Sequence, residues 1–290
     1  NHFIDLFSKE IELLGCTFFE TLTAMAAYYF KDRGVEVAIF ETGLGGKYDS
    51  VTACNSRLQL FTKISMDHSH ILGESLDQIA QDKSCAIHSN SRCYSVAQDD
   101  SVSKILIEKA KLKSAEMNFN LERYNEEIVP SLFGKHQIEN IRLALTAAQQ
   151  IMRLTENNIN NAISNVNWPG RFELLQDSPR VYFDVAHNDD SINAFCDAIS
   201  SLNHQHTKTL IVSMQKTKNI QESIPKLEKI FSKIIITQLN DRMYSPHTLS
   251  SFFINKERIE IVYSPEQVIT STLKHMADNE LLAIIGSHYW

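Results

Sequence analysis

The alternation of strand-like and helix-like segments is the feature that most constrains how this chain can fold. In the first half, helical patterns surround three β-rich apolar runs, at residues 35–40, 58–64 and 92–96. Those helical patterns cover residues 18–30, 75–87, 101–112 and 138–154. In the second half, helices at 191–202, 220–231 and 265–276 alternate with strands at 181–183, 209–214, 233–239, 259–263 and 281–285. Alternation of this kind predicts parallel sheets with crossover helices, and therefore an α/β fold.

A stretch rich in helix and strand breakers divides the chain. Residues 165–171 read NVNWPGR, where Pro and Gly interrupt the alternation. A chain of 290 residues is long enough for about two domains. We therefore place a boundary at about residue 170, which gives domains of residues 1–170 and 171–290.

Charge, hydropathy and cysteine use exclude several classes of protein. The net charge of -7 offers no basic surface for nucleic acid, and no apolar run approaches the ~20 residues of a membrane span. The five cysteines are scattered and never form a C-x-x-C pair, which argues against a disulfide framework and a zinc knuckle. The cysteine pattern favours a cytoplasmic protein, and we expect neither nucleic acid nor a membrane as a partner.

The glycine-rich stretch ETGLGGKYDS, residues 41–50, follows the apolar run VEVAIF. It fails the phosphate-loop pattern G-x-x-x-x-G-K-[ST], because Glu41 stands at the first glycine position and Tyr48 at the hydroxyl position. It also fails the dinucleotide pattern G-x-G-x-x-G. A carboxylate at a strand end is a suitable Mg²⁺ ligand, so Glu41 is a candidate. The alternative is a solvent-exposed acid in a plain strand-to-helix turn.

A second polar loop follows the next predicted strand. Residues 65–76 read SMDHSHILGESL, so Asp67, His68 and His70 also stand at a strand end. Because ligands bind at the carboxyl ends of strands in α/β sheets, this loop and Glu41 could converge on one metal and its phosphates. The alternative for each histidine is an ordinary surface or capping role.

The helix after this loop carries a lysine on its apolar face. Ser75 and Gln78 form an S-x-x-Q capping box, and Lys83 shares the stripe of Leu76, Ile79, Ala80 and Ile87. Lysine is rarely buried without a partner, and burial favours its neutral form. A neutral amine can bind a metal or be carbamylated by CO₂. Alternatively, Lys83 extends its ammonium from the edge of the stripe into solvent.

Polar side chains also stand at helix starts and strand ends on both sides of the predicted boundary. Asn140 lies in the first turns of a long helix, a position that suits a polar or anionic ligand. Asp184 and His187 follow the strand VYF, before Asn188 or Asp189 as N-cap. Arg171 follows the WPG break and could reach a phosphate. The alternatives are an ordinary polar residue for Asn140 and a structural salt bridge for Arg171.

Six motifs in order resemble one known family. They are ETGLGGKYDS, SMDHSHILGESLDQIAQDKSCAI, GKHQIENIRLAL, WPGRFE, FDVAHN and the terminal GSHY. Together they resemble folylpolyglutamate synthase/dihydrofolate synthase, of the Mur ligase superfamily, over nearly the whole chain. The resemblance implies a Mur-ligase-like α/β fold: a partial central ATPase-type α/β domain followed by a Rossmann-like α/β C-terminal domain.

The resemblance also implies roles for individual residues. Two Mg²⁺ ions would be held by Glu41, His68 and a carbamylated Lys83, and the catalytic residues would be Lys83 and His187. ATP would contact Asn140, Arg171 and Asp184, and glutamate would lie near His187 and Ser287. The pterin pocket would be lined by Thr17, Phe18, Phe19, Glu20, Tyr48, Asp49 and Ser50.

The implied activity is an ADP-forming ligation of L-glutamate to dihydropteroate or to the glutamate tail of a folate, through an acyl phosphate, by a monomer. The family's glycine-rich phosphate loop is absent between Asn1 and Trp290. We therefore expect an N-terminally truncated chain, also cut at its other end, that is inactive alone, and activity should be assayed with the product of the complete coding region. Two alternatives remain: a ligase of another amino acid, and a non-catalytic relative that binds pterin or a protein partner.

Departures from the family pattern occur at three places. The loop has KYDS for the usual R-x-D, the segment after Lys83 reads SCAI where the family tends to AGI, and MQKTKN replaces an M-x-x-K-D pattern near residue 214. These departures put pterin affinity and turn geometry in question, but not the reaction class.

Overall fold

The chain folds into two compact units, each described here by itself. The computed structural model describes residues 2–125, 127–202 and 207–290. Unit 1 comprises Asn1–Ser65 and Ser69–Leu121, and unit 2 comprises Met66–His68 and Glu122–Trp290. The domain boundary predicted near residue 170 stays a prediction.

Unit 1 is built around a three-stranded parallel sheet with the order β1-β2-β3. Its elements are α1 (His2–Leu14), α2 (Phe18–Asp32), the 3₁₀ helix η1 (Ser50–Cys54), β1 (Leu58–Phe61), α3 (Ser69–Leu72), α4 (Leu76–Ser84), β2 (Arg92–Ser95), α5 (Asp100–Leu112) and β3 (Glu116–Asn118). The strands predicted near residues 58–64 and 92–96 and the helices near 18–30, 75–87 and 101–112 are confirmed.

The core of unit 1 lies between α4, α5 and the sheet. Ile79 and Ala80 of α4 are fully buried with Val102 and Leu106 of α5 against Phe61. The predicted capping box is present, because the Gln78 N–H donates to Ser75 Oγ and the Ser75 N–H donates to Gln78 Oε1, both at 3.3 Å. The apolar stripe and the cap thus fix where α4 begins and which face it buries.

The strand predicted at residues 35–40 is wrong. This segment has no regular secondary structure and pairs with no strand among the residues that the structure describes. Its apolar residues remain exposed, with Val35 at 43%, Val37 at 42% and Ile39 at 87%. A β-rich composition forms a strand only where a neighbouring backbone accepts its hydrogen bonds. Glu41 therefore follows an irregular segment rather than the end of a paired strand.

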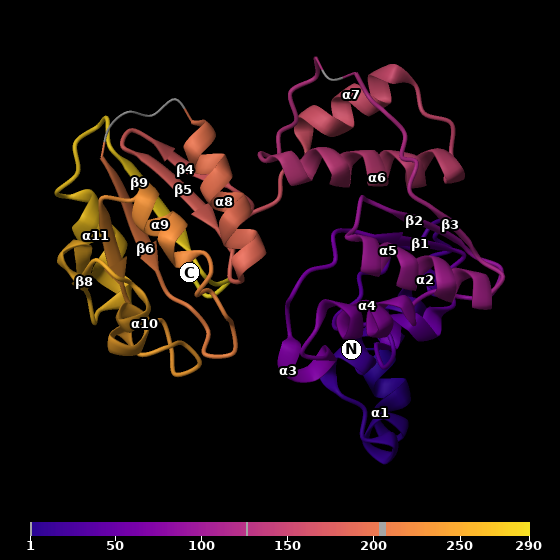
Figure 1. Ribbon diagram of the computed structural model, residues 1–290. Helices are drawn as coiled ribbons and strands as arrows, with labels where there is room; N and C mark the ends of the chain where they lie inside the picture. Colours follow the sequence, from indigo (N-terminus) through magenta and orange to yellow (C-terminus); the bar gives the residue numbers. More distant parts are fainter. Residues whose placement is uncertain (1, 126, 203–206) are drawn as a thin grey trace. The chain divides into compact units, whose positions relative to one another are not determined.

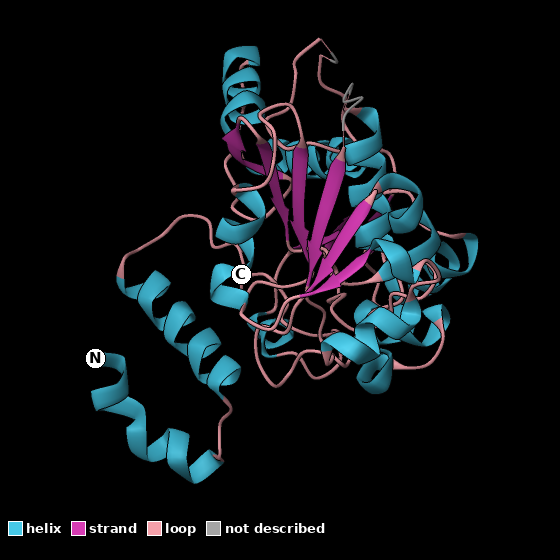
Figure 2. Ribbon diagram, turned by 90° about the vertical axis from the view of Figure 1, so that its left-hand side faces the viewer, coloured by secondary structure: helices cyan, strands magenta, loops and turns pink. Residues whose placement is uncertain are grey.

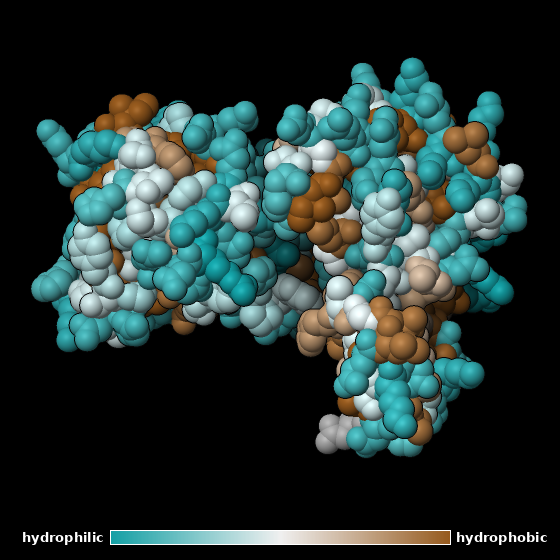
Figure 3. Space-filling model, turned by 90° about the horizontal axis from the view of Figure 1, so that it is seen from below, coloured by the Kyte–Doolittle hydropathy of each residue, from teal (hydrophilic) through white to brown (hydrophobic). Residues whose placement is uncertain are grey.

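The two N-terminal helices of unit 1 expose much apolar surface. No side chain of α1 is buried, and Thr23 is the one that α2 buries. Brown residues lie among teal ones on these helices at the lower right of Figure 3. Exposed apolar side chains include Leu13 at 86% and Leu14 at 75%. The fold of unit 1 thus depends on its α4–α5 core.

Unit 2 is dominated by a six-stranded sheet with the order β4-β5-β9-β6-β7-β8. Its elements are α6 (Lys135–Ile151), α7 (Glu156–Asn165), β4 (Glu173–Asp177), β5 (Arg180–Asp184), α8 (Asp189–Ser201), β6 (Lys208–Val212), α9 (Ile224–Ile230), β7 (Lys233–Ile236), α10 (Pro246–Phe252), η2 (Lys256–Arg258), β8 (Ile259–Ile261), α11 (Pro265–Leu273) and β9 (Leu281–Ile285). All neighbours are parallel except β4, which is antiparallel to β5. The five predicted strands and all four predicted helices are confirmed.

Helices cover both faces of the six-stranded sheet, whose strands fan out in Figure 2. On one face, Ile199 of α8 and Leu227 of α9 pack against Leu210 of β6, with α8 and α9 in front of the strands in Figure 1. On the other face, Val268 of α11 packs against Ile211. Because both faces are buried, the central strands are continuous apolar runs such as LLAII in β9.

Parallel pairing brings the carboxyl ends of β5, β9, β6, β7 and β8 to one edge of the sheet. The turns at this edge approach one another closely. Gly286 has φ +113°, and a Cβ there would lie 2.1 Å from the Ser213 carbonyl oxygen. A side chain cannot be accommodated, so glycine lets the turn after β9 pass beside the end of β6.

Among the residues that the structure describes, no helix combines the length and the apolar composition needed to cross a bilayer.

Candidate active site

Polar side chains gather at the carboxyl edge of the six-stranded sheet in unit 2. Asp184 ends β5, His187 and Asn188 lie in the turn into α8, Lys218 follows β6, and Ser287 follows β9. Two of the predicted residues, Asp184 and His187, therefore lie on one turn, as their strand-end position suggested.

Asp184 organises the turns around it. Its Oδ2 accepts from the Phe172 N–H at 2.8 Å and its Oδ1 accepts from the Ala186 N–H at 2.7 Å. Burial raises the pKa of Asp184 above its usual range, and these two hydrogen bonds, with Arg171 and His187, offset part of that rise. The carboxylate thus fixes the backbone on either side of β5 while it remains close to Arg171.

His187 and Asn188 are held by the start of α8. The Asn188 side chain accepts from the Ser191 N–H at 2.9 Å and completes a capping box. His187 Nδ1 lies 2.8 Å from the Val185 carbonyl oxygen. A carbonyl oxygen only accepts, so Nδ1 must carry the proton, and Nε2 faces away toward Asp67. The helix cap therefore aims one imidazole nitrogen into the cluster.

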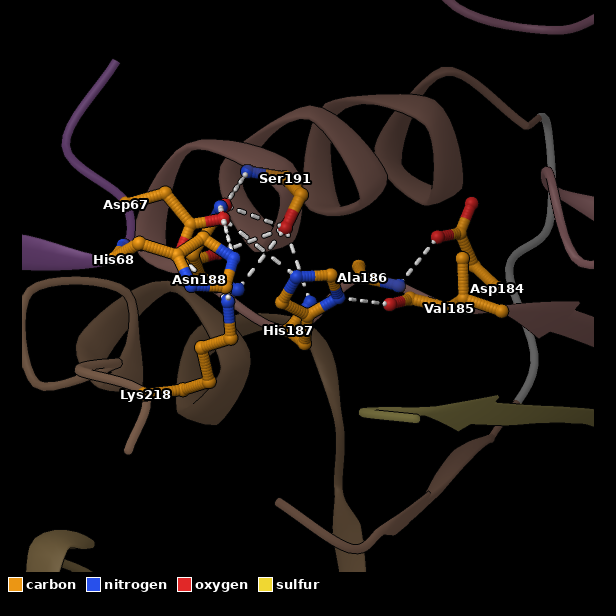
Figure 4. A network of polar contacts seen from close by, with 9 residues as sticks. All are labelled: Asp67, His68, Asp184, Val185, Ala186, His187, Asn188, Ser191 and Lys218. Carbon is orange, nitrogen blue, oxygen red and sulfur yellow. Dashed lines mark hydrogen bonds and ion pairs between the residues drawn. The ribbon is translucent and has the colours of Figure 1, made fainter. Parts of the chain in front are cut away.

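One carboxylate, Asp67, lies at the centre of this cluster (Figure 4). Its Oδ1 accepts from Lys218 Nζ at 2.6 Å, and its Oδ2 accepts from Asn188 Nδ2 at 3.1 Å and lies 3.7 Å from His187 Nε2. Lys218 Nζ is also 3.2 Å from His68 Nε2. Burial alone would raise the pKa of Asp67, but the nearby His187 side chain and the hydrogen-bonded ammonium of Lys218 hold it well below its usual range.

Lys218 was not predicted from the sequence. Asp67 was predicted only as part of a loop that could converge on a metal and its phosphates, and Asn188 only as one of two N-cap candidates, of which it is the N-cap of α8. Lys218 is buried, with 7% of its side chain exposed, although its stretch MQKTKN reads as an ordinary polar turn. The one available signal was its position in the loop after β6, whose last three residues, LIV, are apolar and buried. A buried lysine requires a partner, and that partner lies 151 positions earlier in the chain.

The remaining predicted residues of unit 2 lie around this edge or on α6. Arg171 is exposed and lies close enough to His136 and His288 to lower their pKa values further, beyond the larger lowering that burial causes. Asn140 donates to Gln137 Oε1 within α6 at 3.1 Å. Ser287 is buried, and its Oγ accepts from the Tyr289 N–H at 3.1 Å.

In unit 1, the glycine-rich loop lies directly on α4. Asp82 Oδ1 accepts from the Gly46 N–H at 2.8 Å, and a Cβ on Gly46 would lie 2.7 Å from the Lys83 carbonyl oxygen. Gly45 has φ +70°, and a Cβ there would lie 2.2 Å from Asp82 Oδ1. Gly45 and Gly46 therefore allow the backbone of the loop to lie close to α4, and this packing rather than a phosphate explains why they are glycines. Residues 45–46 of the loop thus rest against the turn of α4 that carries Lys83.

The residues predicted to line a pterin pocket occupy adjoining parts of unit 1. Ser50 Oγ is 2.8 Å from Thr23 Oγ1 of α2, and Phe19 packs on Gly43. Thr17 and Glu20 cap α2, and Asp49 caps η1 through the Val51 N–H. Phe18 and Tyr48 expose 82% and 84% of their surface, so their rings are accessible. The residues that cap α2 and η1 and the two accessible rings therefore come from the same two segments, residues 17–20 and 48–50.

The predicted metal ligands are divided between the units. Glu41 is exposed and Lys83 is half-buried in unit 1, whereas His68 belongs to unit 2. Within the described residues, no group of three or more His, Cys, Asp or Glu side chains could hold a metal ion. A metal site made by Glu41, His68 and Lys83 therefore stays a prediction.

Comparison with known proteins shows which proteins this chain is similar to. Residues 170–288 match the family model "Mur ligase, glutamate ligase domain". A dihydrofolate synthase/folylpolyglutamate synthase of Bacillus subtilis is 28% identical over 309 aligned positions, which cover 94% of this chain and 70% of the relative. A probable bifunctional folylpolyglutamate synthase/dihydropteroate synthase of Haloferax volcanii is 24% identical, and the match covers 94% of this chain but 36% of that protein.

Solved structures share the fold. The Mycobacterium tuberculosis folylpolyglutamate synthase complexed with ADP and AMPPCP matches with a TM-score of 0.86 at 22% identity, over 99% of this chain and 74% of that one. E. coli FolC in complex with DHPP and ADP gives a TM-score of 0.84 at 22% identity, over 94% of this chain and 69% of that one. Residues 170–288 therefore match a Mur ligase glutamate ligase domain, and nearly the whole chain is similar in sequence and fold to folylpolyglutamate and dihydrofolate synthases.

Proposed function

We propose that this protein ligates L-glutamate to dihydropteroate, to the glutamate tail of a folate, or to both, with conversion of ATP to ADP. The observation that carries the proposal is the cluster at the carboxyl edge of the six-stranded sheet. Asp184, His187, Lys218 and Ser287 lie there, within the residues that match a glutamate ligase domain. An ammonium, an imidazole and a buried hydroxyl at one sheet edge suit a small anionic substrate.

The substrate classes are supported by the names of the relatives. The Bacillus subtilis relative is named for both dihydrofolate and folylpolyglutamate synthesis, and the two solved relatives hold ADP, AMPPCP or DHPP. Accessible Phe18 and Tyr48 suit a flat pterin ring, which stacks on aromatic side chains. We assign Thr17, Phe19, Glu20, Asp49 and Ser50 to the same pocket.

We assign the nucleotide to unit 2 residues near Asp184. Arg171 offers a fork of donors for phosphate oxygens, and Asn140 offers an amide that can hydrogen-bond a base or ribose. The raised pKa of Asp184 reflects burial, which also favours its use as a hydrogen-bond partner of a ribose hydroxyl. His187 and Ser287 would then lie toward the glutamate.

Mg²⁺ fits the donor set only in part. Glu41 supplies an exposed carboxylate, and a carbamylated Lys83 would supply a second one, which suits a hard cation. In unit 2, however, His68 Nε2 lies 3.2 Å from the ammonium of Lys218, so it faces a cation already. We propose Glu41, His68 and carbamylated Lys83 as ligands of two Mg²⁺ ions, which would offset charge on the phosphates when bound.

The chemistry we propose has two steps. An oxygen of the folyl or pteroyl carboxylate attacks the γ-phosphorus of ATP, the bond to the β-phosphate oxygen breaks, and an acyl phosphate and ADP form. The glutamate amine then attacks the acyl carbon, loses a proton and releases inorganic phosphate. The guanidinium of Arg171 would stabilise the negative charge that develops on the transferred phosphoryl group.

We place the reaction in the cytoplasm, carried out by a monomer. All five cysteines, Cys16, Cys54, Cys85, Cys93 and Cys196, are free thiols. Free thiols are typical of a reducing compartment. Size-exclusion chromatography with light scattering checks the monomer, and a dimer mass would contradict it.

The test is an assay of ADP formation by the product of the complete coding region. We expect ADP release only when ATP, L-glutamate and a pteroyl or folyl acceptor are all present, with a product longer by one glutamyl residue in mass spectrometry. Turnover with another amino acid in place of glutamate would indicate a different ligase. Acceptor binding without any turnover would indicate a non-catalytic relative.

A further inference from the structure

Asp67 lies close to four polar groups at the candidate site. Its two oxygens receive the ammonium of Lys218 at 2.6 Å, the amide of Asn188 at 3.1 Å and the backbone N–H of His68 at 2.8 Å. His187 Nε2 lies 3.7 Å from the same carboxylate. These partners come from the turn after β5, the loop after β6 and its own loop, so one side chain joins three segments (Figure 4).

Lys218 depends on this carboxylate. Only 7% of the lysine side chain is exposed, compared with 26% of Asp67. A buried ammonium without an anionic partner is strongly destabilising, and Asp67 supplies that partner at close range. The aliphatic part of Lys218 has few alternative positions at this degree of burial, so the carboxylate determines where the ammonium lies.

The same carboxylate holds the backbone of His68. His68 has φ +52°, in the left-handed region that a residue with a side chain rarely adopts. The His68 N–H donates to Asp67 Oδ1 and so stabilises this turn. The conformation places His68 Nε2 3.2 Å from Lys218 Nζ. One side chain therefore fixes both the histidine and the lysine.

We propose that Asp67 is a positioning residue for the ligation: it holds Lys218 and His187 at the sheet edge so that they receive the negatively charged amino-acid substrate. Asp67 itself need not touch the substrate, because its two oxygens are already engaged. The inference rests on the proposed function, and it adds a residue to which the family resemblance assigned no role.

The test is a double-mutant cycle on the product of the complete coding region, with Asp67→Asn, Lys218→Met and the double variant. Asp67→Asn keeps the size and the hydrogen-bonding capacity of the side chain but removes its charge. We expect kcat/KM for L-glutamate to fall about 30-fold in each single variant and by no more than about 100-fold in the double variant, because both act through one contact. The KM for ATP should stay within about two-fold, since neither residue is assigned to the nucleotide.

Controls separate positioning from general stability. Glu260→Gln breaks the half-exposed Lys233–Glu260 pair on β7 and β8, and kcat/KM should stay within about two-fold. Thermal unfolding of each variant checks folding, and Asp67→Ser serves as a second variant if Asp67→Asn unfolds. Independent losses that multiply to about 1000-fold, or an unchanged KM and kcat in Asp67→Asn, would overturn the proposal. Absence of glutamate-dependent turnover in the wild-type protein would instead remove the proposed function itself.

Discussion

At the scale of single residues, the glycines of ETGLGGKYDS and the ion pair of Asp67 have physical roles that can be tested separately. The glycines predicted a turn from the sequence, but the sequence did not show what the turn packs against. Only the structure shows that Gly46 lies against the Lys83 carbonyl of α4. A close approach between two segments leaves no periodic trace in a sequence, and the same holds for Lys218, whose partner is Asp67.

Gly46→Ala should destabilise unit 1 because its Cβ would meet backbone oxygens of α4 at 2.7 and 2.8 Å. Backbone cannot move as freely as a side chain, so we expect a loss of about 1–3 kcal/mol in the free energy of unfolding. Urea denaturation measures it. Gly15→Ala is the matched control, because Gly15 has φ +63° and no atom within 4 Å of a new Cβ. Its cost should be limited to about 1 kcal/mol of backbone strain, and an equal loss in both variants would contradict the packing argument.

The low pKa of Asp67 predicts how stability depends on pH. A carboxyl whose folded-state pKa lies below its unfolded value contributes stability above the unfolded value, about 3.9, and loses it as the pH falls. We expect Asp67→Asn to cost about 2 kcal/mol at pH 7 and much less at pH 2. Urea denaturation at several pH values gives the difference. A difference that does not depend on pH would show that the charge of Asp67 is not what stabilises the fold.

At the scale of helices and strands, prediction succeeded where burial imposes a pattern. β6 and β9 were predicted because both their faces are buried and they read as apolar runs. β4 was missed because it is the outermost strand of the sheet and exposes Leu174 and Leu175. The segment at residues 35–40 has strand composition but no neighbouring strand in the described structure, so composition alone misled. Pairing is a tertiary property that composition does not contain.

The capping box of α4 should be measurable as helix stability. Ser75→Ala removes the acceptor of the Gln78 N–H, so we expect a loss of about 1 kcal/mol. Ser264→Ala is the control, since Ser264 occupies the N-cap position of α11 without a side-chain cap hydrogen bond. Thermal or urea unfolding of both variants gives the comparison, and an equal effect at the two positions would argue against the cap.

At the scale of the whole molecule, the similarity to folylpolyglutamate and dihydrofolate synthases and the α/β class could be predicted from the sequence, whereas the contacts at the centre of the site could not. Six motifs in order indicated which proteins the chain resembles. The positions of Asp184 and His187 after a strand predicted part of the site. The contacts of Asp67, Asn188 and Lys218 join segments that lie far apart in the sequence. They arise only when parallel strands bring their carboxyl ends to one edge.

The most direct test of the central claim is ADP formation by the product of the complete coding region, measured with each substrate omitted in turn. We predict ADP release that requires L-glutamate and a pteroyl or folyl acceptor together, with one ADP for each glutamyl residue added. ADP release that is independent of glutamate, or no release with every acceptor tested, would contradict it.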